Sequence, residues 1–145
     1  MSRNDLNFNA IDLNFNALSS ACFANAKSKG FYDTLGRIQD ILEGSAAEGY
    51  ISLEEAAKLN TELLTIWRLS RIALIMSELG EAVEAVRKPA LTGHIEGLSL
   101  FDEEMADVII RMADFAGSEG IDMNRAVALK MEFNAGRERM HGKQA

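Results

Sequence analysis

The stretch SELGEAVEAVRKP, residues 77–89, has the composition and spacing of a helix that ends at a proline. Its apolar residues recur three and four positions apart, which is the period of one helical face. Upstream, Ser52 and Glu55 match a capping box, and nothing interrupts the pattern before Pro89. One helix is therefore predicted from residue 52 to residue 88, about 55 Å long. A helix of that length leaves room for a bend or an interruption near Trp67.

The rest of the chain also favours helices. Proline occurs once and β-branched alternating runs are scarce. Near the N-terminus, DLNFNA occurs at 5–10 and again at 12–17, a repeat of seven residues that places apolar side chains on one helical stripe: Phe8, Ile11, Phe15, Leu18 and Cys22. The alternative is that the first copy is a frayed arm. The further predicted elements are a helix from Thr34 to Leu42 closed by Gly44, a loop at 43–50, a loop at 89–100, a helix at 101–118 ended by Gly120, and a helix at 123–139 capped by Asp122.

These elements predict an all-α fold of four or five helices in a single domain, residues 1–145. The formal net charge of −7 argues against binding to a nucleic acid polymer or to an anionic membrane. No apolar run approaches the roughly 18 residues of a membrane span, and residues 1–20 lack the pattern of a secretory signal. We therefore expect a cytoplasmic protein. Cys22 is the single cysteine, so no internal disulfide can form, and a small buried residue is expected there.

Two pairs of carboxylates lie on consecutive predicted helices. Glu78 and Glu81 are three residues apart, and Glu104 and Asp107 repeat that spacing. On a helix this spacing places both side chains on one face. The helices are joined by a loop, so they are expected to pack antiparallel, with the two pairs at matching heights.

Four carboxylates in a partly dry groove would repel one another, and a bound cation would remove the conflict. Oxygen ligands suit a hard ion, Mg²⁺ or Mn²⁺, and Mg²⁺ usually keeps positions for water and substrate phosphates. The pattern therefore points to phosphate chemistry. A solvated helix face is the commoner explanation for any single pair, and it is preferred for Glu84, which lies about 120° around the helix from Glu78.

Three stretches resemble the MazG-like all-α nucleoside triphosphate pyrophosphohydrolases: ELGEAVEAVRKP, EEMADVIIRMADFAGSEGID and AVALKMEFNAGR. The family signature, ExxE and then ExxD, matches Glu78 and Glu81, twenty-two intervening residues, then Glu104 and Asp107. Further similarity at NAKSKGFYD (25–33) and at the terminal HGK extends the match over most of 12–33 and 71–143. The segment at about 34–71 looks like a helical insertion. Ser77 departs from the pattern, because many members carry a glutamate there.

The resemblance implies Mg²⁺-dependent cleavage between the α- and β-phosphates, which yields a nucleoside monophosphate and pyrophosphate. It implies that the four carboxylates are the catalytic, metal-binding residues and that the last helix binds substrate through Lys130, Asn134 and Arg137. Residues 124–145, with five basic and two acidic side chains, fit phosphate contact. The alternative for these cations is that they complement the helix dipole. The resemblance also implies a homodimer or homotetramer that completes the site, and housecleaning of nucleotides as a role.

Other candidates are given structural roles. Arg111 and Asp114 are expected to form an ion pair, although they could extend the site. Tyr32 and Trp67 could stack on a base, but they and Phe31 are expected in the core. His94 is expected to be solvated, without a partner. Glu138 and His141 resemble half of a di-iron motif whose other half is missing.

Two alternatives to an active enzyme remain open. A catalytically weak member of the same fold could bind nucleotides or mediate oligomerisation, with Ser77 as the sign of decay. A purely structural helical bundle is the third reading.

Overall fold

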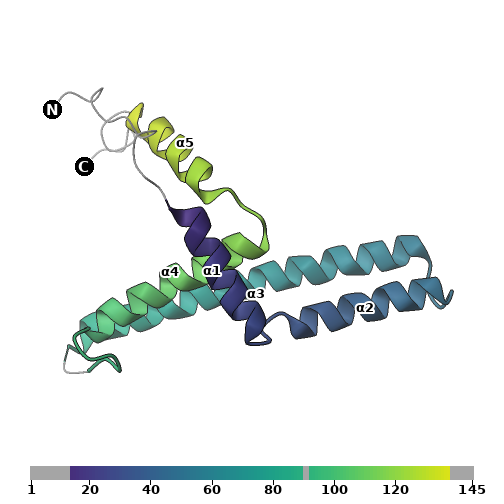
Figure 1. The fold of residues 1–145 in the computed structure, drawn as a ribbon, viewed down its shortest axis with the longest axis horizontal. Helices are drawn as coiled ribbons and strands as arrows, with labels where there is room; N and C mark the ends of the chain where they lie inside the picture. The colour runs from purple at the N-terminus through teal and green to yellow at the C-terminus, as the bar shows by residue number, and fades with distance from the viewer. Residues whose placement is uncertain (1–13, 90–91, 138–145) are drawn as a thin grey trace.

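The computed structural model describes residues 14–89 and 92–137, and this part of the chain is all-helical. It contains five helices and no strand beyond an isolated bridge between Thr92 and Ser99 (Figure 1). The helices are α1 (Phe15–Ser28), α2 (Asp33–Ala47), α3 (Leu53–Arg87), α4 (Leu100–Ser118) and α5 (Met123–Ala135). None of these helices combines the length and apolarity needed to cross a bilayer. The predicted fold class is therefore confirmed at the level of helical content.

The long helix α3 begins and ends close to the predicted residues. Ser52 lies at the N-cap, where its hydroxyl accepts a hydrogen bond from the backbone amide of Glu55 at 3.0 Å. The helix is continuous over 35 residues, so the alternative of an interruption near Trp67 is wrong. The full reciprocal capping box forms at α4 instead, between Ser99 and Asp102.

Helix α2 is longer than predicted. The expected end at Gly44 and the loop at 43–50 are wrong, because the helix continues to Ala47. A glycine inside a helix costs only about 1 kcal/mol relative to alanine, and the residues Ser45, Ala46 and Ala47 continue the helix. The reversal falls at Gly49, whose φ of +78° suits a residue without a side chain.

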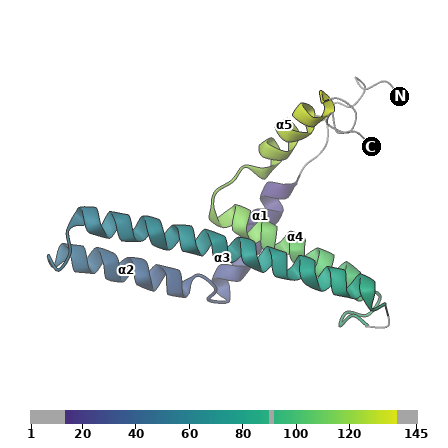
Figure 2. The same cartoon turned by 180° about the vertical axis from the view of Figure 1, so that it is seen from behind.

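The helices form two pairs that share α3. Helix α2 runs beside the first part of α3, and this hairpin projects away from α1 and α4 (Figures 1 and 2). Gln39 donates a hydrogen bond to Asn60 across it at 3.0 Å. The hairpin covers the segment expected to be a helical insertion. Helix α4 packs along the second part of α3, and α1 crosses α4.

Two predictions near the ends of the chain need comment. Helix α5 ends at Ala135, with Gly136 at the C-cap, rather than at 139. A glycine has the lowest helix propensity after proline, so it favours an end there. In the N-terminal stripe, Phe15, Leu18 and Cys22 lie on α1, whereas Phe8 and Ile11 lie outside the described residues. Cys22 is partly exposed rather than buried.

The described part of the chain buries few large apolar side chains. Its buried hydrophobic residues are alanines and one valine: Ala82, Ala85, Val108, Ala113 and Ala116. By contrast, one face of α3 carries larger apolar residues that are between 44% and 66% exposed: Leu69, Ile72, Met76, Leu79, Val83 and Val86. Their spacing alternates between three and four residues, which is the pattern of a coiled-coil seam. We call these six residues the α3 seam.

Candidate metal centre

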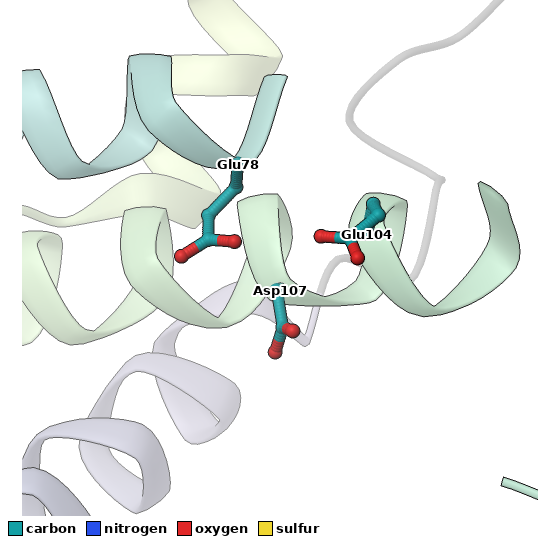
Figure 3. A group of neighbouring side chains, drawn as sticks. All are labelled: Glu78, Glu104 and Asp107. Carbon is teal, nitrogen blue, oxygen red and sulfur yellow. The ribbon is translucent and has the colours of Figure 1, made fainter. Parts of the chain in front are cut away.

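Three of the four predicted carboxylates come together. One ligand oxygen from each of Glu78, Glu104 and Asp107 lies within 4.8 Å of the others, a separation at which the group could hold one metal ion. Glu78 extends from α3 toward α4, on which Glu104 and Asp107 lie about a turn apart (Figure 3). The two glutamates are buried, whereas Asp107 is exposed. The group is therefore open to solvent on one side.

The packing of α3 against α4 positions this group. On α3, Glu78 shares its buried face with Ala82 and Ala85. These positions are four and three residues apart, so they form one stripe. Alanine side chains let the two helices approach closely, and the carboxylate of Glu78 is thereby directed toward α4. On α4, Glu104 lies one turn before the buried Val108 and faces the same interface.

Glu81 lies beside the group but outside it. Its side chain is exposed, and it borders an open hollow of about 380 Å³ together with Ser77, Glu84, His94 and Glu104. Its charge is one of those that act on Glu104. The structure therefore brings Glu78, Glu104 and Asp107 together and leaves Glu81 at the edge.

The pKa of Glu104 reflects its burial and the repulsion between these carboxylates. Burial raises the pKa of its carboxyl group, and the charges of Glu81, Glu78, Asp107 and Glu103 raise it further. The carboxyl group therefore keeps its proton to a higher pH than an isolated glutamate does. A bound cation would reverse the balance, because it favours the ionised form of each carboxylate around it.

Arg111 lies next to the group, and the sequence favoured for it an ion pair with Asp114 over an extension of the site. Its Nε donates to a carboxylate oxygen of Glu78 in a short ion pair. The predicted pairing of Arg111 with Asp114 is therefore wrong. Asp114 instead accepts a hydrogen bond from the hydroxyl of Tyr32 at 2.7 Å. Arg111 and Asp114 share a helical face, but each has a partner on another element. Arg111 pairs with Glu78 on α3, and Asp114 pairs with Tyr32 in the turn after α1.

Glu103 has a structural role that sequence reasoning missed. Its buried carboxylate accepts hydrogen bonds from the backbone amides of His94 at 2.9 Å and Ile95 at 2.5 Å. These bonds hold the pKa of Glu103 below its ordinary value. The side chain of His94 is 88% exposed, so the solvated position predicted for it is confirmed. Its ring Nδ1 also lies 3.2 Å from the same carboxylate, a partner that the sequence did not predict. Glu103 thus fixes the loop before α4 and the start of the helix that bears Glu104.

An aromatic and cationic cluster lies near the group. The Arg71 guanidinium lies over the Trp67 ring at 4.0 Å and over the Tyr32 ring at 5.1 Å, and Tyr32 also contacts Phe23 edge-on. Tyr32 and Trp67 were expected in the core, but both are only partly buried. Phe31 was expected in the core, but it is 60% exposed. Its backbone carbonyl accepts a hydrogen bond from Arg71 at 3.1 Å.

The predicted substrate-binding residues lie on α5 or just beyond its end, away from the carboxylates of the same chain. Helix α5 packs against the start of α1 and diverges from α3 and α4 (Figure 1). The cationic groups of Lys130 and Arg137 lie over the Phe133 ring, at 4.9 Å and 6.0 Å from its centroid. Asn134 lies on the same helix. Glu138 and His141 lie outside the described residues.

Glu84 has the surface role expected for it. It pairs with Arg87 at 2.9 Å and Lys88 at 2.8 Å, and both cations are well exposed. Pairs of this kind contribute little to stability.

Comparisons with known proteins gave no match, whether the chain was set against protein-family models, curated proteins or solved structures.

Proposed function

We propose that the chain is a Mg²⁺-dependent nucleoside triphosphate pyrophosphohydrolase that cleaves between the α- and β-phosphates. The observation that carries this proposal is the set of three carboxylates at the α3–α4 interface, two of them buried, with a raised pKa at Glu104. A purely structural interface gains nothing from repulsion between buried carboxylates. A site for a hard divalent cation requires such a set of oxygen ligands.

In this proposal Glu78, Glu104 and Asp107 hold the metal, and Glu81 completes the coordination or accepts a proton from water. Mg²⁺ is preferred and Mn²⁺ would also fit an all-oxygen site. Such an ion neutralises phosphate charge and acidifies a bound water molecule. The exposed side of Asp107 gives a polyphosphate access to the ion. Arg111 balances Glu78 and lies close enough to contact a phosphate once another cation takes over that role.

A second copy of the chain would supply the substrate-binding cations. Lys130 and Asn134 lie on α5 and Arg137 lies just beyond its end, and this helix has little packing inside its own chain. Large apolar residues remain exposed on it, Leu129 at 52% and Phe133 at 63%. The α3 seam is exposed as well. A homodimer or homotetramer that covers these surfaces could place α5 of one copy near the carboxylates of another.

The alternative is a catalytically weak nucleotide-binding or oligomerisation module of the same fold. The Arg111–Glu78 pair favours it, because a resident cation already balances one of the carboxylates. Ser77, at the rim of the hollow beside Glu81, is the second feature in its favour.

A screen of ribo- and deoxyribonucleoside triphosphates with Mg²⁺ and pyrophosphate detection tests the proposal. At least one nucleotide should release pyrophosphate, and Glu81→Gln should lower kcat at least about a hundredfold. Glu54→Gln, an exposed change in the first turn of α3, is the control and should leave kcat unchanged. Nucleotide binding without pyrophosphate release would favour the weak module, and unchanged turnover in Glu81→Gln would overturn the assigned role of that residue.

A further inference from the structure

A second, smaller hollow adjoins the carboxylate group on the side of Asp107. It has a volume of about 180 Å³ and lies where α1, the turn after α1, α3 and α4 meet. The lining residues that matter here are Asn25, Phe31, Arg71, Asp107, Arg111 and Asp114. A molecule whose phosphates lie at Asp107 would therefore extend its remaining part into this hollow.

Most polar groups in the wall are already engaged. Arg71 donates to the carbonyl of Phe31 and is held flat against Trp67. Arg111 is paired with Glu78, and Asp107 belongs to the carboxylate group. These contacts hold the side chains that shape the hollow, and the buried Nε of Arg71 has no hydrogen-bond partner among the described residues.

Two other polar groups in the wall can take part in binding a ligand. One is the exposed carboxamide of Asn25, which has no protein partner in this part of the chain. The other is the second oxygen of Asp114, since its first oxygen accepts from Tyr32. The pKa of Tyr32 is raised to about 12, chiefly by burial, so this hydroxyl remains a donor at neutral pH. Asp114 is therefore held in place and keeps one acceptor for a ligand.

Phe31 adds an aromatic surface at the rim. It lies in the turn after α1, is 60% exposed and lines the hollow. An exposed aromatic ring beside a small polar hollow suits a planar heterocycle, because base–aromatic stacking contributes roughly 1–3 kcal/mol per base.

We propose that this hollow binds the nucleobase of the substrate, with the base stacked on Phe31, and selects bases that carry an exocyclic amino group. The inference rests on the proposed function for the position of the phosphates. An ionised carboxylate accepts hydrogen bonds but cannot donate them. Asp114 therefore favours the exocyclic amino groups of cytosine (N4), adenine (N6) and guanine (N2), which thymine and uracil lack. Asn25 can donate or accept beside it.

Isothermal titration with nucleoside monophosphates in the presence of Mg²⁺ tests the proposal on the intact protein. Monophosphates have no α–β anhydride, so binding is measured independently of hydrolysis. The monophosphates dCMP, dAMP and dGMP should bind at least about tenfold more tightly than dTMP, a difference in binding free energy of about 1.4 kcal/mol. Asp114→Asn should remove this preference. Phe31→Leu should weaken the binding of all four monophosphates. Asn25→Ala changes an exposed residue, leaves the Tyr32–Asp114 hydrogen bond intact, and should weaken the binding of the preferred monophosphates.

A substitution far from the hollow serves as the control. Tyr50→Leu changes a residue that is 78% exposed at the far turn between α2 and α3, and binding should remain as in the unmodified protein. Equal affinity for all four monophosphates, or unchanged affinity in Phe31→Leu and Asn25→Ala, would overturn the base pocket. If the variants weaken monophosphate binding while no triphosphate is cleaved, the pocket stands and the proposed hydrolysis fails. If triphosphates are cleaved with the same KM in Phe31→Leu, the hydrolysis stands and the pocket fails.

Discussion

Arg111 has the most direct influence on the carboxylate group of any residue outside it. Its guanidinium offsets the charge of the buried Glu78, which would otherwise be left unpaired next to Glu104. A buried carboxylate without a partner is costly. Arg111 and a metal ion therefore compete for the same negative charge, and the strength of the pair tunes how readily the group accepts a cation.

Arg111→Gln should make the metal-free protein less stable and its metal site stronger. Loss of the pair should lower the free energy of unfolding by roughly 1–3 kcal/mol. This is less than for a fully buried pair, because the Arg111 side chain is 39% exposed. Mn²⁺ should bind about tenfold more tightly, since Glu78 becomes free to bind the ion. Thermal unfolding and titration with Mn²⁺ measure the two effects. Arg87→Gln, which removes a surface pair with Glu84, is the matched control. Weaker Mn²⁺ binding in Arg111→Gln would show that the arginine orients Glu78 for the metal instead.

Tyr32 provides a test of packing through its ionisation. Burial is the largest cause of its raised pKa, and the hydrogen bond to Asp114 adds to it. The folded protein therefore binds this proton more tightly than the unfolded chain does, and the stability that depends on it should fall as pH rises from about 10 to about 12. An absorbance titration of Tyr50→Phe, in which Tyr32 is the remaining tyrosine, should have its midpoint near 12. In Asp114→Asn the midpoint should fall only partly, because burial persists. A midpoint near 10 in Tyr50→Phe would contradict the packing described here.

At the scale of helices, the crossing of α1 over α4 depends on one glycine. A side chain at Gly117 would place its Cβ 2.6 Å from the carbonyl oxygen of Ser19 and 2.8 Å from the Cβ of Phe23. Backbone cannot move aside as a flexible side chain can. The absence of a side chain at Gly117 thus sets how closely α1 approaches the helix that bears Glu104 and Asp107.

Gly117→Ala should lower the free energy of unfolding by roughly 1–3 kcal/mol through overpacking at this crossing. Gly44→Ala is the matched control, because Gly44 lies inside α2 with no atom within 4 Å of an added Cβ. That change should stabilise the protein by roughly 0.5–1 kcal/mol, since alanine is the better helix former. Chemical denaturation measures both values. A neutral Gly117→Ala would mean that α1 and α4 do not approach as closely as described.

Local signals in the sequence predicted the helices and much of the carboxylate group. Ser52, Pro89 and Asp122 mark helix ends by chemistry that acts within a few residues, and the spacing of Glu104 and Asp107 follows from helical geometry alone. The pairing of Arg111 with Glu78, the stacking of Arg71 on Trp67 and the exposure of Phe31 could not be predicted, because each depends on which helices meet. The length of α2 was missed because a single glycine is a weak helix terminator.

At the scale of the whole molecule, the exposed α3 seam predicts self-association. Its six apolar residues have the alternating spacing with which helices pack knobs into holes. Such a face on a chain whose described core is mostly alanine suits burial against a second copy, since covering apolar surface contributes about 25 cal/mol per Å². The oligomer would then supply packing that a single chain lacks.

Light scattering should give the mass of an oligomer, a multiple of the single-chain mass of 15.9 kDa. Met76→Glu should reduce this mass, because a charge in the middle of the seam cannot be buried without a partner. Ile41→Glu is the control: Ile41 is as exposed, at 64%, but lies on α2 outside the seam, and the mass should stay unchanged. A single-chain mass for the unmodified protein would contradict the seam as an interface. An unchanged mass in Met76→Glu would move the interface to another surface, such as α5.

The hairpin of α2 and the first part of α3 has a consequence for how this protein could change in evolution. Its two helices leave the body of the molecule side by side and are joined at the turn around Gly49 (Figure 2). Segments of about seven residues, roughly two helical turns, could be lost or gained there if α2 and α3 changed in step, and the position of Glu78 relative to α4 would be preserved. The hairpin is thus an arm of adjustable length, and selection on its reach could act separately from selection on the carboxylate group.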